Sequence, residues 1–188
     1  IELFAAVIRT GLAFAIFYYS TQLLKGYRKY IGILVSVLIH MSMLPILAFY
    51  LFYYFVRKVT NIEFTFVTLL VLFLFSIAIM LGLNMVNPAG GNSFGLGYKA
   101  ITFCLAVVFI FFSAYYSALK SVEGFVGIGL IFLILISFIF DYNLIRYIAI
   151  STIYFTTYII NTKRTAVVNL YTIAYFPFFL TYFLFWVR

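Results

Sequence analysis

The chain has 188 residues, of which 67% are hydrophobic, 23% aromatic and only 9% charged, and its formal net charge is +8. Soluble domains are about half apolar and about a quarter charged, so a soluble core of this length could not enclose so many apolar side chains. The composition therefore predicts an integral membrane protein, and with no basic face, zinc-ligand spacing or RNA-binding motif we expect no nucleic-acid partner.

Seven apolar runs follow one another, and most approach the roughly 20 residues that a helix needs to cross a bilayer. Short polar joints separate them and no ten-residue alternating strands occur, so we expect an all-α polytopic membrane bundle of six or seven transmembrane helices. Because the chain starts with Ile1 and not Met, we expect residues 1–188 to be a single transmembrane domain from the later part of a longer chain. The runs are 3–24, 30–56, 64–86, 100–119, 124–140, 144–160 and 165–187.

The second run, 30–56, contains the only histidine, His40, followed by Ser42 and Pro45. Proline removes a backbone donor and clashes with the preceding turn. The run is therefore either a long helix kinked at Ser42–Pro45 or a re-entrant hairpin that turns back there. A straight crossing divides the basic residues of the joints and the final residue almost evenly, whereas a hairpin gives a positive-inside bias with the joint "KGYRK" in the cytoplasm. The hairpin puts Lys25, Arg28, Lys29, Arg57, Lys58, Lys120, Lys163 and Arg164 on one side, and Lys99, Arg146 and Arg188 on the other.

Three ionisable residues of the apolar runs stand out, because charges inside a membrane are costly and usually functional. They are Arg9, His40 and Arg146, and the hairpin places all three toward the outer half of the bilayer. Each also has a simpler explanation: Arg9 can extend to the outer headgroups, His40 can bond a neighbouring carbonyl, and Arg146 can pair with Asp141.

Together, two arginines and an imidazole with few carboxylates nearby favour an external anion. The planar guanidinium of arginine suits phosphate oxygens, and histidine can take a proton from a hydroxyl near neutral pH. We therefore expect phosphate-linked substrate chemistry at the outer leaflet. No His, Cys and carboxylate spacing predicts a metal site, no cofactor is expected, and the lone Cys104 is expected to act as a small hydrophobic residue.

The stretch "VIRTGLAFAIFYYSTQLLKGYRKYIGILVSVLIHMSMLPILAFYLF" resembles the EpsG-like, Wzy-type oligosaccharide repeat-unit polymerases of bacterial envelopes. The resemblance lies in an arginine before a small-residue helix (Arg9), a basic turn (25–29), and an apolar helix that ends in His-x-Ser (His40 and Ser42). Arg146 is similar to a second arginine near the start of a late helix. The resemblance covers residues 5–55 well and 140–188 loosely.

This resemblance implies a glycosyltransferase that joins undecaprenyl-diphosphate-linked repeat units into O-antigen or capsule at the outer face of the bacterial inner membrane. It implies that Arg9 and Arg146 bind the donor diphosphate, while His40 accepts the proton of the attacking sugar hydroxyl and Ser42 orients the reaction. The partners would be the lipid-linked oligosaccharide, the bilayer and other polysaccharide-assembly membrane proteins. The alternatives are a transporter or flippase of lipid-linked oligosaccharides, a membrane acyltransferase and a structural scaffold.

Overall fold

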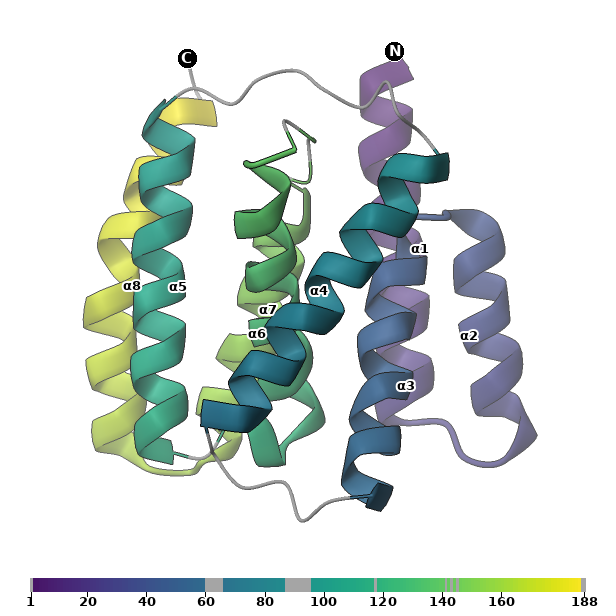
Figure 1. The fold of residues 1–188 in the computed structure, drawn as a ribbon, viewed down its shortest axis with the longest axis horizontal. Helices are drawn as coiled ribbons and strands as arrows, with labels where there is room; N and C mark the ends of the chain where they lie inside the picture. Colours follow the sequence, from purple (N-terminus) through teal and green to yellow (C-terminus); the bar gives the residue numbers. More distant parts are fainter. Residues whose placement is uncertain are drawn as a thin grey trace. The chain divides into compact units, whose positions relative to one another are not determined.

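The computed structural model describes residues 2–59, 66–86, 96–116, 118–140, 142, 144 and 146–186. This described part of the chain is all-helical, as the sequence predicts, and it contains eight α-helices, one 3₁₀ turn and no strands (Figure 1). The elements are α1 (Glu2–Gln22), α2 (Tyr27–Ile39), α3 (Met43–Val59), α4 (Phe66–Val86), α5 (Leu96–Tyr116), η1 (Ala118–Lys120), α6 (Val122–Ser137), α7 (Arg146–Asn161) and α8 (Thr165–Trp186).

The second apolar run is two helices, not one. The break lies at His40–Ser42, slightly before the predicted position, because Pro45 stands in the first turn of α3. A proline is tolerated there because the first backbone N–H groups of a helix have no partner within it. Figure 1 shows α3 running in the direction opposite to that of α2, so the chain turns back rather than continuing straight.

Three predicted joints are shorter than expected because the helices extend into them. Helix α2 begins at Tyr27, α3 continues past Arg57 to Val59, and α5 begins at Leu96 and so includes Lys99. Polar side chains do not by themselves end a helix, and basic residues near a C-terminus interact favourably with the helix dipole. The boundaries predicted from hydropathy at residues 30, 56 and 100 were therefore wrong by three or four residues, and each helix is longer there than predicted.

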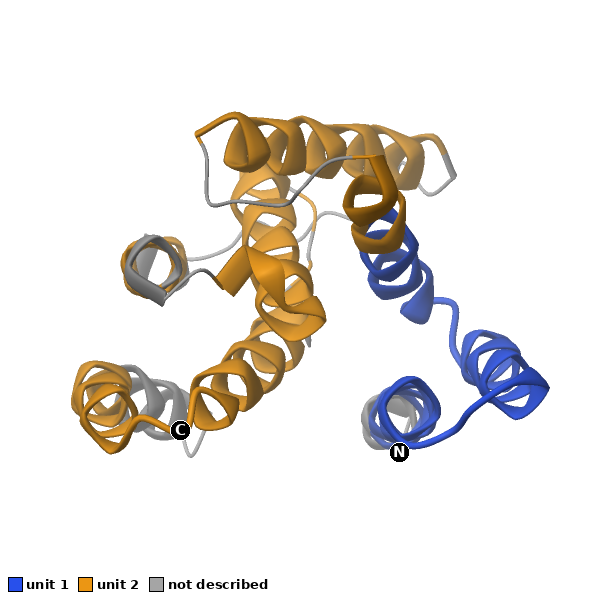
Figure 2. Ribbon diagram, turned by 90° about the horizontal axis from the view of Figure 1, so that it is seen from below, with its two compact units in different colours: residues 1–52 blue, residues 53–188 orange. Residues whose placement is uncertain are grey.

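The chain divides into two compact units, residues 1–52 and 53–188, so α3 contributes to both (Figure 2). Unit 1 consists of α1, α2 and the first part of α3. Its α1 and α2 are antiparallel neighbours, and a Cβ added at Gly32 would overlap the Ser20 hydroxyl, so the small residue is required for this close approach. The Phe17 ring packs edge-on against Tyr50, which ties α1 to α3.

Unit 2 is organised around α6. This helix packs against α4, α5, α7 and η1, and nearly all of its side chains are buried (Figure 1). A helix that is apolar on every face is typically covered by protein or by lipid, and here protein covers it. Its N-terminus is capped by Ser121, whose hydroxyl accepts a hydrogen bond from the Gly124 N–H at 2.9 Å. Helix α8 completes the unit by packing on α5 and α7.

Small residues bring the backbones of α6 and α7 together. A Cβ at Gly127 would meet the Phe155 nitrogen at 3.2 Å and the Ser151 oxygen at 3.3 Å. The Ser151 hydroxyl donates to the Gly127 carbonyl at 2.7 Å, and on the other side of α6 the Ser76 hydroxyl of α4 donates to the Gly129 carbonyl at 3.4 Å. Close backbone contact and interhelical hydrogen bonds of this kind are typical of helices that pack in lipid.

Five of the described basic side chains of unit 2 lie at one end. The Tyr53 hydroxyl donates to the Lys120 carbonyl at 2.7 Å, which joins the C-terminal part of α3 to η1 at the end where α7 is linked to α8. At the opposite end the Lys99 ammonium lies 5.9 Å from the centre of the Phe138 ring. The exposed cations at the first end are Arg57, Lys58, Lys120, Lys163 and Arg164.

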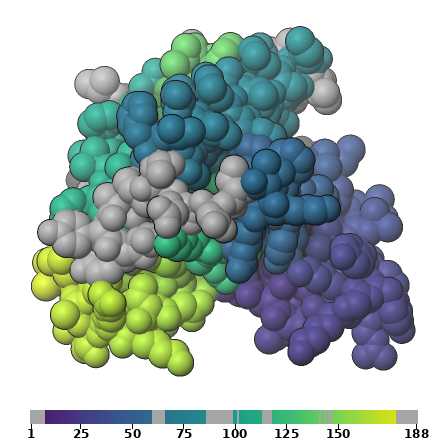
Figure 3. All heavy atoms as spheres, turned by 60° about the horizontal axis from the view of Figure 1, so that its bottom comes forward, coloured from purple at the N-terminus to yellow at the C-terminus, as the bar shows by residue number. Residues whose placement is uncertain are grey.

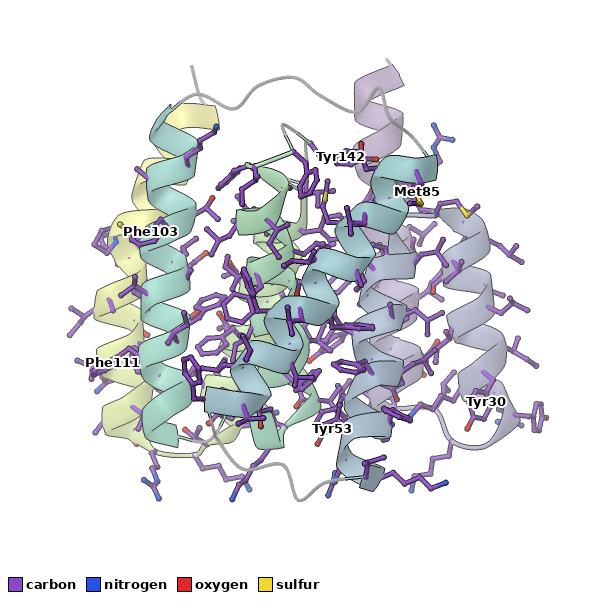
Figure 4. All side chains as sticks on the ribbon, viewed as in Figure 1. Tyr30, Tyr53, Met85, Phe103, Phe111 and Tyr142 are labelled. Atoms are coloured by element: carbon purple, nitrogen blue, oxygen red, sulfur yellow. The ribbon has the colours of Figure 1, made fainter. Side chains whose placement is uncertain are left out.

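Large apolar side chains cover much of the outer surface. Phe103 and Phe111 of α5 are 62% and 52% exposed and point away from the rest of unit 2 (Figure 4). The side chains of α4 occupy a large part of the face drawn in Figure 3. Within the described residues, one segment, Phe66–Met85, is both long enough and apolar enough to cross a membrane.

Candidate functional site

His40 forms the corner between α2 and α3. Its backbone is extended, with φ −154° and ψ 116°, so the helix cannot continue through it. Its N–H still donates to the Ser36 carbonyl of α2 at 3.1 Å, and its carbonyl accepts from the Met43 N–H of α3 at 3.0 Å. The residue thus makes one backbone hydrogen bond with the end of α2 and one with the start of α3.

The His40 imidazole takes part in the same turn. The Ser42 backbone N–H donates to the imidazole Nδ1 at 3.1 Å. This bond spans two residues, in the manner of an Asx turn, and it provides a partner for an N–H that the start of α3 would otherwise leave unsatisfied. The side chain is half-buried, so part of its surface stays accessible. The His-x-Ser spacing stands out in the sequence, but that spacing gives no sign that the backbone of Ser42 supplies the hydrogen bond.

Arg9 lies at the same end of unit 1 as His40. The contact between Gly32 and Ser20 sets the register of the antiparallel pair α1 and α2. From this contact, Arg9 is about 16 Å along α1 and His40 about 12 Å along α2, at about 1.5 Å per residue. The two residues therefore differ in height by about one helical turn, and the Arg9 side chain is exposed.

Arg9 borders the packed face of its helix. Thr10, Ala13, Phe17 and Ser20 are buried and define this face. Arg9 is the neighbour of Thr10 in the sequence and adjoins this face on the helix, and its side chain is exposed.

Arg146, the third predicted residue, belongs to unit 2. It is the first residue of α7, but its side chain and the whole of Asp141 lie outside the described residues. The structure brings Arg9, His40 and Ser42 into one unit and leaves the placement of the Arg146 side chain a prediction. Among the described residues, no group of three His, Cys, Asp or Glu side chains could hold a metal ion.

Comparisons with family models, with curated proteins and with solved structures found no match to this chain.

Proposed function

We propose that the chain is a multi-pass protein of the bacterial inner membrane. The exposed surfaces of its helices carry large apolar side chains that acyl chains would cover, whereas five cations gather at one end of unit 2. The lengths of α2 and α3, 13 and 17 residues, support a re-entrant hairpin within this membrane protein. At about 1.5 Å per residue, each is shorter than the roughly 30 Å hydrocarbon core and fits an arm of a re-entrant hairpin.

Labelling of introduced cysteines tests this topology. In a Cys104→Ser background, Tyr27→Cys before α2 and Lys58→Cys near the end of α3 should both react with a membrane-impermeant maleimide only after the cells are opened. Both positions are exposed, and the hairpin returns α3 to the cytoplasmic side from which α2 starts. Labelling of one of them in intact cells would mean that α2 and α3 together cross the bilayer.

Within this membrane, the proposed activity is joining undecaprenyl-diphosphate-linked oligosaccharide repeat units into a surface polysaccharide. The observation that supports it is the corner at His40, which lies about one turn from the level of the exposed Arg9. A guanidinium suits the diphosphate of the donor, and its charge would stabilise the departing diphosphate in the transition state. Arg146 is the proposed second contact to the diphosphate, and other polysaccharide-assembly membrane proteins are the proposed partners.

Polymer formation from purified lipid-linked repeat unit tests this activity directly. The wild-type chain in liposomes should produce a ladder of products, and Arg9→Ala should reduce the rate about a hundredfold or more, as expected when one charge-stabilising donor is lost. Arg28→Ala is the matched control, because it removes an exposed arginine at the opposite end of unit 1 and should leave the rate close to wild type. Equal rates for wild type and Arg9→Ala would remove the proposed role of Arg9.

A transporter or flippase of lipid-linked oligosaccharides remains the alternative. Transporters that hold anions at broken helices usually have such breaks in two matching halves. Here α8 contains Pro177 but continues through it, so this proline does not make a second break to match the one at His40. If the liposomes move the lipid-linked oligosaccharide across the bilayer without making longer products, transport replaces polymerisation.

A further inference from the structure

The hydrogen bond at His40 fixes which ring nitrogen can carry a proton. A neutral imidazole has one N–H and one nitrogen with a free lone pair. Because the Ser42 backbone N–H is a donor, the Nδ1 atom at 3.1 Å must be the acceptor, so it has no proton. The proton of neutral His40 therefore lies on Nε2.

This tautomer limits what His40 can do to a substrate. The lone pair that a general base needs is already engaged at Nδ1, and Nε2 offers a proton instead of a lone pair. Moving the proton to Nδ1 would set two N–H groups against each other at the corner between α2 and α3. His40 therefore cannot keep its hydrogen bond to the Ser42 N–H and act as a general base in the same tautomer.

We infer that His40 acts as a hydrogen-bond donor through Nε2–H to an oxygen of the substrate diphosphate, rather than as the base that deprotonates the sugar hydroxyl. This inference rests on the proposed polymerase function and specifies the chemistry of its site. The donor adds to the charge of Arg9, which lies at a similar height in unit 1. Both groups then favour negative charge on the leaving diphosphate.

The reaction balances without a histidine base. The acceptor hydroxyl oxygen bonds to the anomeric carbon of the donor sugar, and the bond from that carbon to the diphosphate oxygen breaks with its electron pair on the diphosphate. The hydroxyl proton passes to a diphosphate oxygen, which gains basicity as the bond breaks. His40 Nε2–H and the Arg9 guanidinium stabilise the diphosphate during this change.

A spectroscopic test exploits the fact that the chain has one histidine. Nitrogen NMR of the chain labelled with ¹⁵N-histidine, in liposomes at a pH where the ring is neutral, reports one imidazole without overlap. We expect Nδ1 to resonate as the nitrogen without a proton and Nε2 as the protonated one. The reverse assignment would overturn the inference whatever the chain does to lipid-linked sugars.

Two amide substitutions separate the donor from the base in the polymer assay. In His40→Gln the amide nitrogen can reach the place of Nε2–H, whereas in His40→Asn the oxygen can take the Ser42 N–H and preserve the turn without a distal donor. We expect His40→Gln to stay within about tenfold of wild type, and His40→Asn and His40→Ala to fall about a hundredfold or more. Since neither amide is a base, a His40→Gln variant as inactive as His40→Ala would overturn the inference.

The two proposals fail in different ways. If wild-type chain makes no polymer, the proposed function falls, and the NMR tautomer still decides whether the His40 ring is held as a donor. If wild type makes polymer but the tautomer is reversed or glutamine cannot replace histidine, the polymerase proposal stands and the donor role is wrong.

Discussion

Replacing Phe109 by alanine is expected to lower the free energy of unfolding by about 3–5 kcal/mol. The Phe109 side chain is fully buried, and its ring stacks on that of Phe155 with 4.1 Å between centroids and 11° between planes. This contact joins α5 to α7, so the substitution leaves a cavity between two helices that surround α6. Thermal unfolding of the purified chain in detergent micelles, followed by circular dichroism, measures the loss.

Phe103→Ala is the control for this substitution, because Phe103 lies on the same helix but is 62% exposed (Figure 4). It removes the same atoms without opening a cavity inside the protein, and detergent can occupy their place. We expect its effect to be less than about 1 kcal/mol, the range of most surface substitutions. Equal losses for Phe103→Ala and Phe109→Ala would mean that the outer face of α5 is packed against protein.

Replacing Gly124 by leucine is expected to destabilise unit 2 strongly. A Cβ at Gly124 would overlap the backbone oxygen and carbon of Ala118, which cannot move aside as a flexible side chain can. Overpacking a well-filled interior costs about 1–3 kcal/mol and occasionally more, and here the added atoms meet the turn that leads into α6. Size-exclusion chromatography and the yield of monodisperse protein report the result.

Gly82→Leu is the matched variant for the α6 substitution. No atom lies within 4 Å of a Cβ added at Gly82 in α4, so a leucine there has room. Because glycine costs about 1 kcal/mol relative to alanine inside a helix, this variant should fold at least as well as wild type. A well-folded Gly124→Leu protein would show that η1 does not pack against α6 as described.

The sequence was sufficient to predict the positions of most helices, and the reason is physical. Long apolar runs bounded by charges have few alternatives to helix, so the predicted runs 64–86 and 165–187 nearly coincide with α4 and α8. The break in 30–56 could also be predicted, because proline and a one-sided charge distribution both favoured it. The exact place of the break is accompanied by a hydrogen bond that the Ser42 backbone N–H donates to the His40 side chain, and hydropathy gives no information about such a bond.

The packing around α6 could not be predicted in the same way. The glycines of "VEGFVGIGL" mark a helix that others can approach closely, but a single sequence does not say which helices do so. Contacts such as that between Ser151 and Gly127 depend on the rotation of both helices about their axes. The same limit applies to the candidate site, where residue types predicted Arg9 and His40 but not the ring nitrogen that faces Ser42.

The central place of α6 has a consequence for biosynthesis. During synthesis α4 and α5 are made before α6, and α7 is made after it. The face of α6 that packs against α7 is therefore uncovered until α7 has been made. Helix α7 carries the hydroxyl groups of Ser151, Thr152, Thr156 and Thr157, whereas α6 is almost wholly apolar. The carbonyl of Gly127 on α6 accepts the hydrogen bond of the Ser151 hydroxyl, so a chain that has completed α6 already presents a docking position for α7.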